Sequence, residues 1–219
     1  MNKFVWNPQD IANLAIELSR IACEYRSVIS RIYNKFGKLG LEGYWIGKNY
    51  NIIATEVMNN SRAAFIDWVD YIQYIVPQVI YSVAKLEADG GALDFYLYQG
   101  DEEIRRIEET TETLDGKIKI NISMVKDVVN EDIFFECENA KNKLVEYCRQ
   151  FEELEFLYSS PEILEIYKQL ESISNRNIDM LQIFQENLKW MVETSISKIE
   201  ITEEETLNIS KKISTIINR

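Results

Sequence analysis

The stretch from Gly37 to Gly47, GKLGLEGYWIG, decides the fold of this chain. It holds four of the eight glycines in 219 residues, at positions 37, 40, 43 and 47. Glycine supplies backbone freedom that helix interiors avoid, so a glycine cluster between two helical patterns marks a sharp reversal of the chain. Trp45 adds a large apolar ring that can hold the reversal against the ends of both helices. We therefore expect a helical hairpin that bends at Trp45-Ile46-Gly47.

Apolar residues recur in steps of three and four on both sides of this bend. The first helix is expected to begin at Pro8, with Asn7 as its N-cap and Asp10 in its first turn. Its apolar stripe is Ile11, Leu14, Leu18, Ile21, Tyr25, Val28 and Ile32. The stripe after the bend is Ile46, Tyr50, Ile53, Val57, Ser61, Ala64, Trp68, Tyr71 and Ile75. Such seams are typical of helices that pack antiparallel.

Proline and glycine mark the end of the second helix. Pro77 is expected to kink the helix or to end it near Val76, because proline lacks the backbone N–H that a helix interior needs. Gly90-Gly91 is the firmer stop.

The second half of the chain has the same layout. A helix is expected from Ile120 or Ile122 to about Leu157, with a stripe of Ile133, Cys137, Ala140, Leu144, Tyr147, Phe151 and Leu154. The next helix begins at Pro161, and its stripe is Tyr167, Leu170, Ser174, Asn177, Leu181, Phe184, Leu188 and Met191. Thr202 and Glu205 form a capping box that predicts a short terminal helix.

Residues 91–119 interrupt the pattern and are interpreted as a connector. Ala92 to Gln99 is rich in aromatic residues, and Asp101 to Thr113 is acidic and expected to be helical. A short strand at Ile118 to Ile120 is an alternative for its last part. The fold class predicted is all-α, with two long antiparallel hairpins packed as a four-helix bundle. The domains are 1–90, a first hairpin, 91–119, the connector, and 120–219, a second hairpin with the terminal helix.

Composition excludes several classes of function. The formal charge of −12, from 24 basic and 36 acidic residues, repels phosphate backbones and argues against nucleic-acid binding. The chain has no histidine, the commonest general base and metal ligand. Cys23, Cys137 and Cys148 are interpreted as small buried residues. We expect no enzyme activity, no catalytic or metal site and no cofactor, and keep carboxylate chemistry as a minor alternative.

Hydropathy gives no membrane span. Tyr71 to Ala84 is uncharged for fourteen residues, but it is too short to cross a bilayer and contains Gln73, Pro77 and Gln78. A buried helix face is the main interpretation of this segment, and a membrane-surface role is the alternative. The first eight residues lack the apolar core of a Sec signal peptide.

The first hairpin resembles the WXG superfamily, the helical hairpins exported by type VII (ESX-type, ESAT-like) secretion systems. Trp45-Ile46-Gly47 carries the resemblance, between two helices of suitable length, and residues 4–89 fit the family's plan. The second half fits the shape alone, with Tyr158-Ser159-Ser160 where the motif belongs. An ordinary helical-bundle turn that contains tryptophan is the alternative.

The resemblance implies a protein that works by binding other proteins. Its partners would be a WXG-like protein, a larger effector or the secretion ATPase. It would be secreted without a Sec signal peptide, or cytoplasmic before export. Family members often carry a tyrosine followed four positions later by an acid as an export signal, and Tyr98 with Glu102 matches that spacing after the second helix. A cytoplasmic helical adaptor or chaperone unrelated to secretion is the alternative function.

The two hairpins predict how the chain assembles. One hairpin buries one face and needs a second to complete a bundle, and this chain contains both. We therefore expect an intramolecular pseudo-dimer that is monomeric in dilute solution, with Trp45 and Tyr158 at opposite ends. A homodimer is the alternative.

Overall fold

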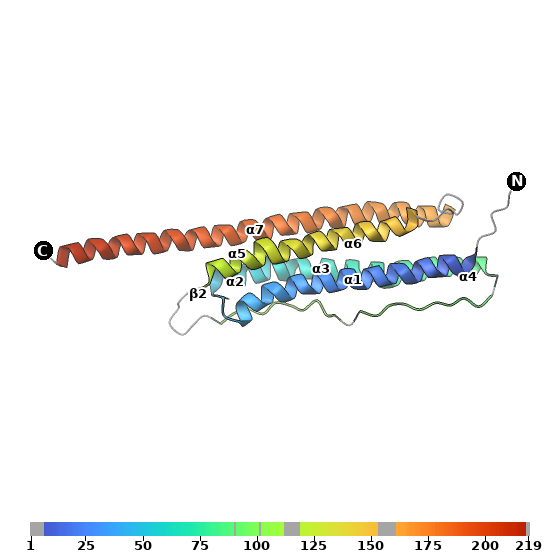
Figure 1. Cartoon of the computed structure of the whole chain (residues 1–219), viewed down its shortest axis with the longest axis horizontal. Coiled ribbons are helices and arrows are strands. Elements are labelled where there is room, and N and C mark those ends of the chain that lie inside the picture. The colour runs from blue at the N-terminus through green and yellow to red at the C-terminus, as the bar shows by residue number, and fades with distance from the viewer. Residues whose placement is uncertain (1–6, 90, 101, 112–118, 153–160, 218–219) are drawn as a thin grey trace.

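The computed structural model describes residues 7–89, 91–100, 102–111, 119–152 and 161–217, with side chains as far as residue 201. The prediction of a mostly helical chain is confirmed (Figure 1). The helices are α1 (Pro8–Leu41), α2 (Lys48–Ile53), α3 (Asn60–Asp70), α4 (Val76–Glu87), α5 (Ile122–Asp127), α6 (Phe134–Glu152) and α7 (Pro161–Ile217). The π-helical turns are η1 (Ala54–Asn59), η2 (Tyr71–Ile75) and η3 (Val128–Ile133), and the strands are β1 (Trp45–Ile46) and β2 (Lys119–Ile120).

In this described part of the chain the helices form four rods: α1, the second rod from α2 to α4, the third rod from α5 to α6, and α7. α1 packs against α4 and η2 of the second rod and against α6 of the third. α7 packs against α6 and also touches α2 and η1. Apolar side chains from all of these rods form one continuous core.

α1 begins as its sequence predicts. The side chain of Asn7 accepts a hydrogen bond from the backbone N–H of Gln9 at 3.1 Å, and Pro8 follows at the first helical position. Every residue of the predicted stripe from Ile11 to Ile32 is buried. Local capping and core packing therefore agree along this helix.

The π-helical turns change the buried face of the second rod. The predicted stripe holds at Tyr50 and Ile53, but Ala64 and Ile75 are exposed. Beyond η1 the predicted Trp68 is still buried, but the core is otherwise made by residues one position past the predicted ones, namely Phe65, Val69, Ile72 and Val76. A π-helical turn inserts a residue into the helix, so it rotates every later side chain around the axis.

Pro77 does not end the second rod, but the helix just before it is irregular. η2 lies immediately before it, and α4 continues through it to Glu87. A π-helical turn changes the hydrogen-bonding partners just where proline lacks an N–H, which explains how the helix continues. The helix ends before Gly90-Gly91, and Asp89 adopts a positive φ of 45°.

The connector is not helical where it is described. Residues 91–100 and 102–111, which we call the strap, run as an extended chain along α1 and the second rod (Figure 1). The expected acidic helix at Asp101 to Thr113 is therefore wrong over residues 102–111. The expected short strand is present as β2, which pairs antiparallel with β1 in the register Trp45–Ile120 and Ile46–Lys119.

α7 is longer than expected. It begins at Pro161 as predicted and continues without a break past Thr202 to Ile217, so the separate terminal helix is wrong. Its C-terminal part extends beyond the ends of the other rods (Figure 1). Tyr158-Ser159-Ser160 lies outside the described residues, and the domain boundaries remain a prediction.

None of the three cysteines is in a disulfide, and their surroundings differ. Cys137 is buried as expected, and burial raises the pKa of its thiol to about 12. Cys23 and Cys148 are half-buried, so the expectation that all three are buried is wrong for these two.

An ion-pair cluster joins α1 to α6. The carboxylate of Glu136, 5% exposed, lies 3.0 Å from Nη2 of Arg31 and 3.2 Å from Nζ of Lys35. Burial by itself would raise the pKa of Glu136, but hydrogen bonds from Arg31 and Lys35 outweigh it and hold the pKa below its ordinary value. The folded state therefore binds a proton at Glu136 more weakly than the unfolded chain does.

We predict that Glu136→Gln lowers the free energy of unfolding at pH 7 by about 1–3 kcal/mol, because it removes the charge that two cations surround. A lowered pKa stabilises the fold above the unfolded value of about 4.3, and the stabilisation is lost as pH falls through the folded pKa. Urea denaturation should therefore separate variant and wild type at pH 7 and bring them together near pH 3. Glu138→Gln is the control and should change little, because the Glu138 side chain is 47% exposed and pairs with one cation, Lys141, at i,i+3.

Candidate functional site

The bend is held by an aromatic cluster. Trp45 is fully buried, with its ring centroid 6.5 Å from Phe36 and 6.0 Å from Tyr50, and the latter two rings stack at 5.3 Å. The indole Nε1–H of Trp45 is buried without a hydrogen-bond partner among the described residues. The ring stabilises the bend from inside, and its burial keeps it from direct contact with another protein.

Gly47 starts the second rod in a conformation that other residues avoid. Its φ of 120° lies outside the range of L-amino acids with side chains. Its N–H donates to Oγ1 of Thr110 at 3.1 Å, and its carbonyl accepts from the N–H of Asn51 at 3.1 Å. The motif glycine therefore joins the bend to α2 and to the strap.

Gly40 allows the aromatic cluster to pack closely against α1. A Cβ atom at this position would lie 2.6 Å from the ring and hydroxyl of Tyr50 and 2.9 Å from the side chain of Thr110. Burial raises the pKa of Tyr50 to about 12. Glycine is required here because the ring and the strap occupy the space of a side chain.

The strap is bound through its backbone by polar side chains of α1 and the second rod. Ser19 and Ser30 of α1 contact the strap at Tyr98 and Glu103, respectively. From the second rod, Gln73 donates to the carbonyl of Tyr98 at 3.1 Å, and Arg62 donates to the carbonyl of Ile104 at 2.6 Å. The strap thus runs parallel to α1 and antiparallel to the second rod.

Two asparagine side chains each pair with both backbone groups of one strap residue. Asn59 donates to the carbonyl of Ile107 at 2.9 Å and accepts from its N–H at 2.9 Å. Asn51 does the same at Thr110, at 3.0 and 2.8 Å. An amide side chain matches a peptide group in this way, so the two asparagines replace the strand partner that an extended chain otherwise needs.

The inward positions of the strap follow two periods. Leu93 and Phe95 alternate with exposed residues, and the ring of Phe95 stacks on Tyr81 at 3.8 Å. Farther on, Ile104 and Ile107 are buried at a spacing of three. That spacing fits an extended chain with three residues per turn as well as it fits a helix.

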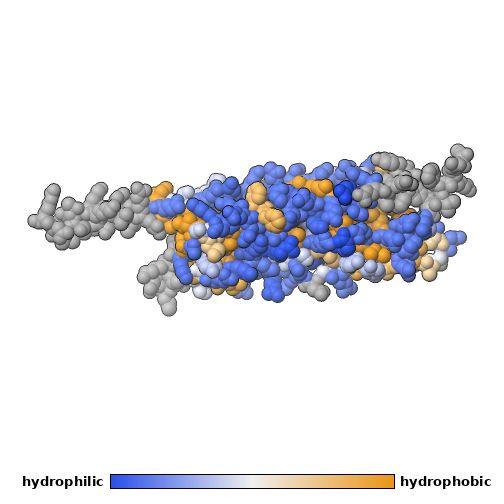
Figure 2. Space-filling model, in the orientation of Figure 1, coloured by the Kyte–Doolittle hydropathy of each residue, from blue (hydrophilic) through white to orange (hydrophobic). Residues whose placement is uncertain are grey.

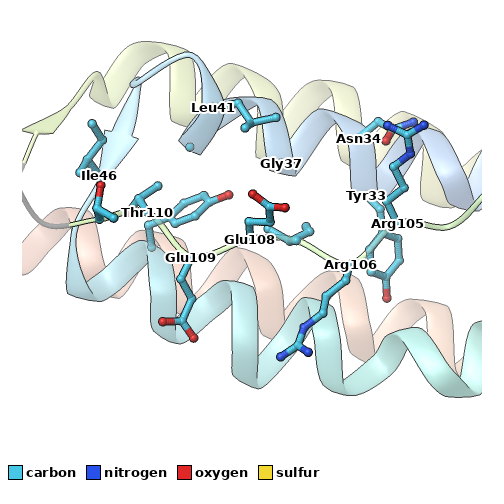
Figure 3. Close-up of a pocket in the computed structure, with 14 residues that line it drawn as sticks. Tyr33, Asn34, Gly37, Leu41, Ile46, Arg105, Arg106, Glu108, Glu109 and Thr110 are labelled. Carbon is cyan, nitrogen blue, oxygen red and sulfur yellow. The ribbon is translucent and has the colours of Figure 1, made fainter.

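A hollow of about 470 Å³ lies between the end of α1 and the strap (Figure 3). Arg105 and Glu108 point toward α1, whereas Arg106 and Glu109 point toward the second rod. The charged groups therefore diverge instead of converging on one point. Within the described residues, no group of three or more cysteine, aspartate and glutamate side chains is placed to hold a metal ion.

The candidate export signal lies on the strap. The N–H of Tyr98 donates to Ser19 Oγ at 2.9 Å, while the residue as a whole is 37% exposed and its hydroxyl lies 3.4 Å from that of Tyr96. Glu102 is exposed. Because residues 91–100 and 102–111 are not helical, Tyr98 and Glu102 do not share one turn of a helix. The backbone is thus fixed and the tyrosine ring displayed.

The bend motif and the strap form one site, whereas Tyr98 and Glu102 lie farther along the strap. The sequence interpretation missed the residues that bind the strap, namely Ser19, Ser30, Asn51, Asn59, Arg62 and Gln73. A polar residue such as Gln73, fully buried in an otherwise apolar helix, is the signal that could have identified them.

No protein-family model, no curated protein and no solved structure matches this chain. In the described part of the chain, no helix combines the length and apolarity needed to cross a membrane.

We predict that Trp45→Ala lowers the free energy of unfolding by about 3–5 kcal/mol, because it removes a fully buried aromatic ring. Trp45→Phe should lower the free energy of unfolding by less, since it keeps an aromatic ring in the cluster. Thermal and urea unfolding measure both, and a wild-type stability for Trp45→Ala would contradict the packing role.

Gly47→Ala is expected to be destabilising because it forces a Cβ into a positive-φ conformation. Gly37→Ala is the matched control. Gly37 lies within α1, and a Cβ there meets no atom within 4 Å, so this change should stabilise the chain by about 0.5–1 kcal/mol. Urea unfolding should show a lower free energy of unfolding for Gly47→Ala and a higher one for Gly37→Ala. Equal changes in the two variants would contradict the geometry assigned to these glycines.

Asn59→Leu is expected to loosen the strap, because it leaves both backbone groups of Ile107 without their partner. The loss should be about 1–3 kcal/mol, and amide hydrogen exchange should become faster at Ile107 first. Asn60→Leu is the control, since Asn60 bonds only to Glu56 of its own rod among the described residues. Unchanged exchange at Ile107 in Asn59→Leu would contradict the assignment.

Proposed function

We propose that this chain is a non-enzymatic interaction protein of a type VII secretion system, either secreted cargo or the partner of a larger effector. The observation that carries the proposal is the Trp45-Ile46-Gly47 bend between two long helical rods. The tryptophan is buried against both rods and the glycine has a backbone conformation that favours glycine. Sequence motif and geometry therefore support the same interpretation.

The packing of the second half supports the fold that this proposal needs. We propose that α1 with the second rod and the third rod with α7 are two hairpins of a tandem pair, packed as a four-helix bundle. α6 covers α1, and α7 contacts α2 and η1, so the second half lies over the first. A hairpin that normally requires a second protein would in this way complete its core within one chain.

Secretion tests the proposal directly. The chain should be found in the culture supernatant of a bacterium with an active type VII system and should stay in the cells of a strain that lacks the membrane ATPase of that system. A cytoplasmic marker protein controls for lysis. Equal retention in both strains would contradict the proposal and favour a cytoplasmic adaptor or chaperone.

Replacing Tyr98 and Glu102 with alanine together should prevent export without unfolding the chain, since both residues are exposed on the strap. Circular dichroism checks the fold. Alanine at Tyr96 and Glu103, the neighbouring tyrosine and acid on the strap, is the matched control and should be exported. Normal export of the first variant would remove these two residues from the signal and leave the signal to a bound partner.

A further inference from the structure

An apolar groove runs along α7 where α7 faces α2 and η1. It consists of two adjoining hollows of about 440 and 170 Å³, which share Trp190 and Met191. Trp190 is 65% exposed and Ile183 is 58% exposed. Large exposed apolar side chains gathered in one hollow are typical of a surface that another element covers.

The groove ends where α7 leaves the bundle. Lys198 is the last α7 residue that lines it, and the helix then continues from residue 202 to Ile217 without another rod beside it (Figure 1). We call residues 202–217 the extension. On the space-filling surface, apolar patches lie close to the base of the extension (Figure 2).

The face of α7 that lines the groove continues into the extension. Groove positions 187, 191, 194 and 198 are followed at the same helical spacing by positions 202, 205, 209, 213 and 216. The sequence places isoleucine at 209, 213 and 216. The sequence therefore places apolar residues at the register of this face on both sides of residue 200, methionine at 191 and isoleucine at 209, 213 and 216, with polar residues between them.

We infer that the extension of one chain lies in the groove of a second copy, and the reverse, in an antiparallel homodimer. A two-fold axis near residue 200 places position 200 + n opposite position 200 − n. Position 209 then faces 191, 213 faces 187 and 217 faces 183. Such an isologous contact is made twice, because each chain supplies one groove and one extension.

Length and charge both fit this occupant. The extension is ~23 Å long, and the groove from Met180 to Lys198 is ~27 Å. The extension begins with Glu203, Glu204 and Glu205 and continues with Lys211 and Lys212. In the antiparallel register, Glu205 lies within one helical turn of Lys198 of the second copy, and Lys212 enters the hollow that Glu56 lines, although Lys211 is opposite Lys189. A parallel arrangement would reverse this order and place like charges together.

This inference goes beyond the proposed function and does not depend on secretion. It also replaces the expectation of a monomer, which rested on the core that the second half completes. That core stays within one chain, and the second copy binds at the groove.

Light scattering on the full chain at micromolar concentration is expected to give twice the mass of one chain. Trp190→Glu and, separately, Ile209→Glu should each shift the mass to that of a monomer while circular dichroism stays unchanged. Phe135→Glu is the control, since Phe135 is 62% exposed on α6 and lies outside the groove, and it should remain dimeric. A monomeric wild type, or a dimer that survives both groove and extension variants, would overturn the inference.

Cysteine cross-linking tests the register. Thr194→Cys with Thr206→Cys should give a disulfide-linked dimer on oxidation, because the two positions face each other across the axis. Within one helix they are ~18 Å apart, too far for a disulfide. Thr194→Cys alone and the unsubstituted chain, with its three native cysteines, are the controls. A linked dimer from either control at the same yield, or none from the double variant, would contradict the register.

Discussion

The structure depends on the close packing of Trp45 and Tyr50 against the end of α1. This packing needs Gly40, because a side chain there would occupy the space of the Tyr50 ring, and it needs Gly47, whose positive φ starts the second rod. The N–H of Gly47 then bonds to Thr110 of the strap. The bend and the strap therefore stabilise each other.

The strap shows how an extended chain can lie on helices without a strand beside it. Helical backbones have their own hydrogen bonds and offer few free groups to a neighbour. The second rod instead supplies asparagine, glutamine and arginine side chains, which bond to the strap backbone at four residues between Tyr98 and Thr110. The neutral amides satisfy the buried backbone and leave the acidic side chains of the strap directed to solvent, a favourable arrangement in a chain of net charge −12.

The sequence was sufficient to predict the structure where local signals, such as helix caps, and the packing of the core agree. The cap at Asn7, the stripe of α1 and the bend at Trp45 were predicted because each depends on residues close together in the chain. The buried face of the second rod was not predicted beyond η1. The π-helical turn η1 shifts that face by one residue, and such a turn leaves no clear pattern in a single sequence. The strap was missed because a spacing of three between Ile104 and Ile107 is shared by an amphipathic helix and an extended chain with three residues per turn.

Length favours one of those two conformations. The second rod ends near Glu87, while β2 and α5 lie beside the bend at the other end of α1. α1 has 34 residues and is ~51 Å long. Residues 91–111 would span ~32 Å as a helix but ~65 Å as an extended chain. A helical connector would therefore need most of residues 112–118 stretched to their limit to reach β2, whereas an extended one arrives with chain to spare. The distance between the ends of α1 thus favours the strap, and the strap in turn requires the polar side chains that bind its backbone.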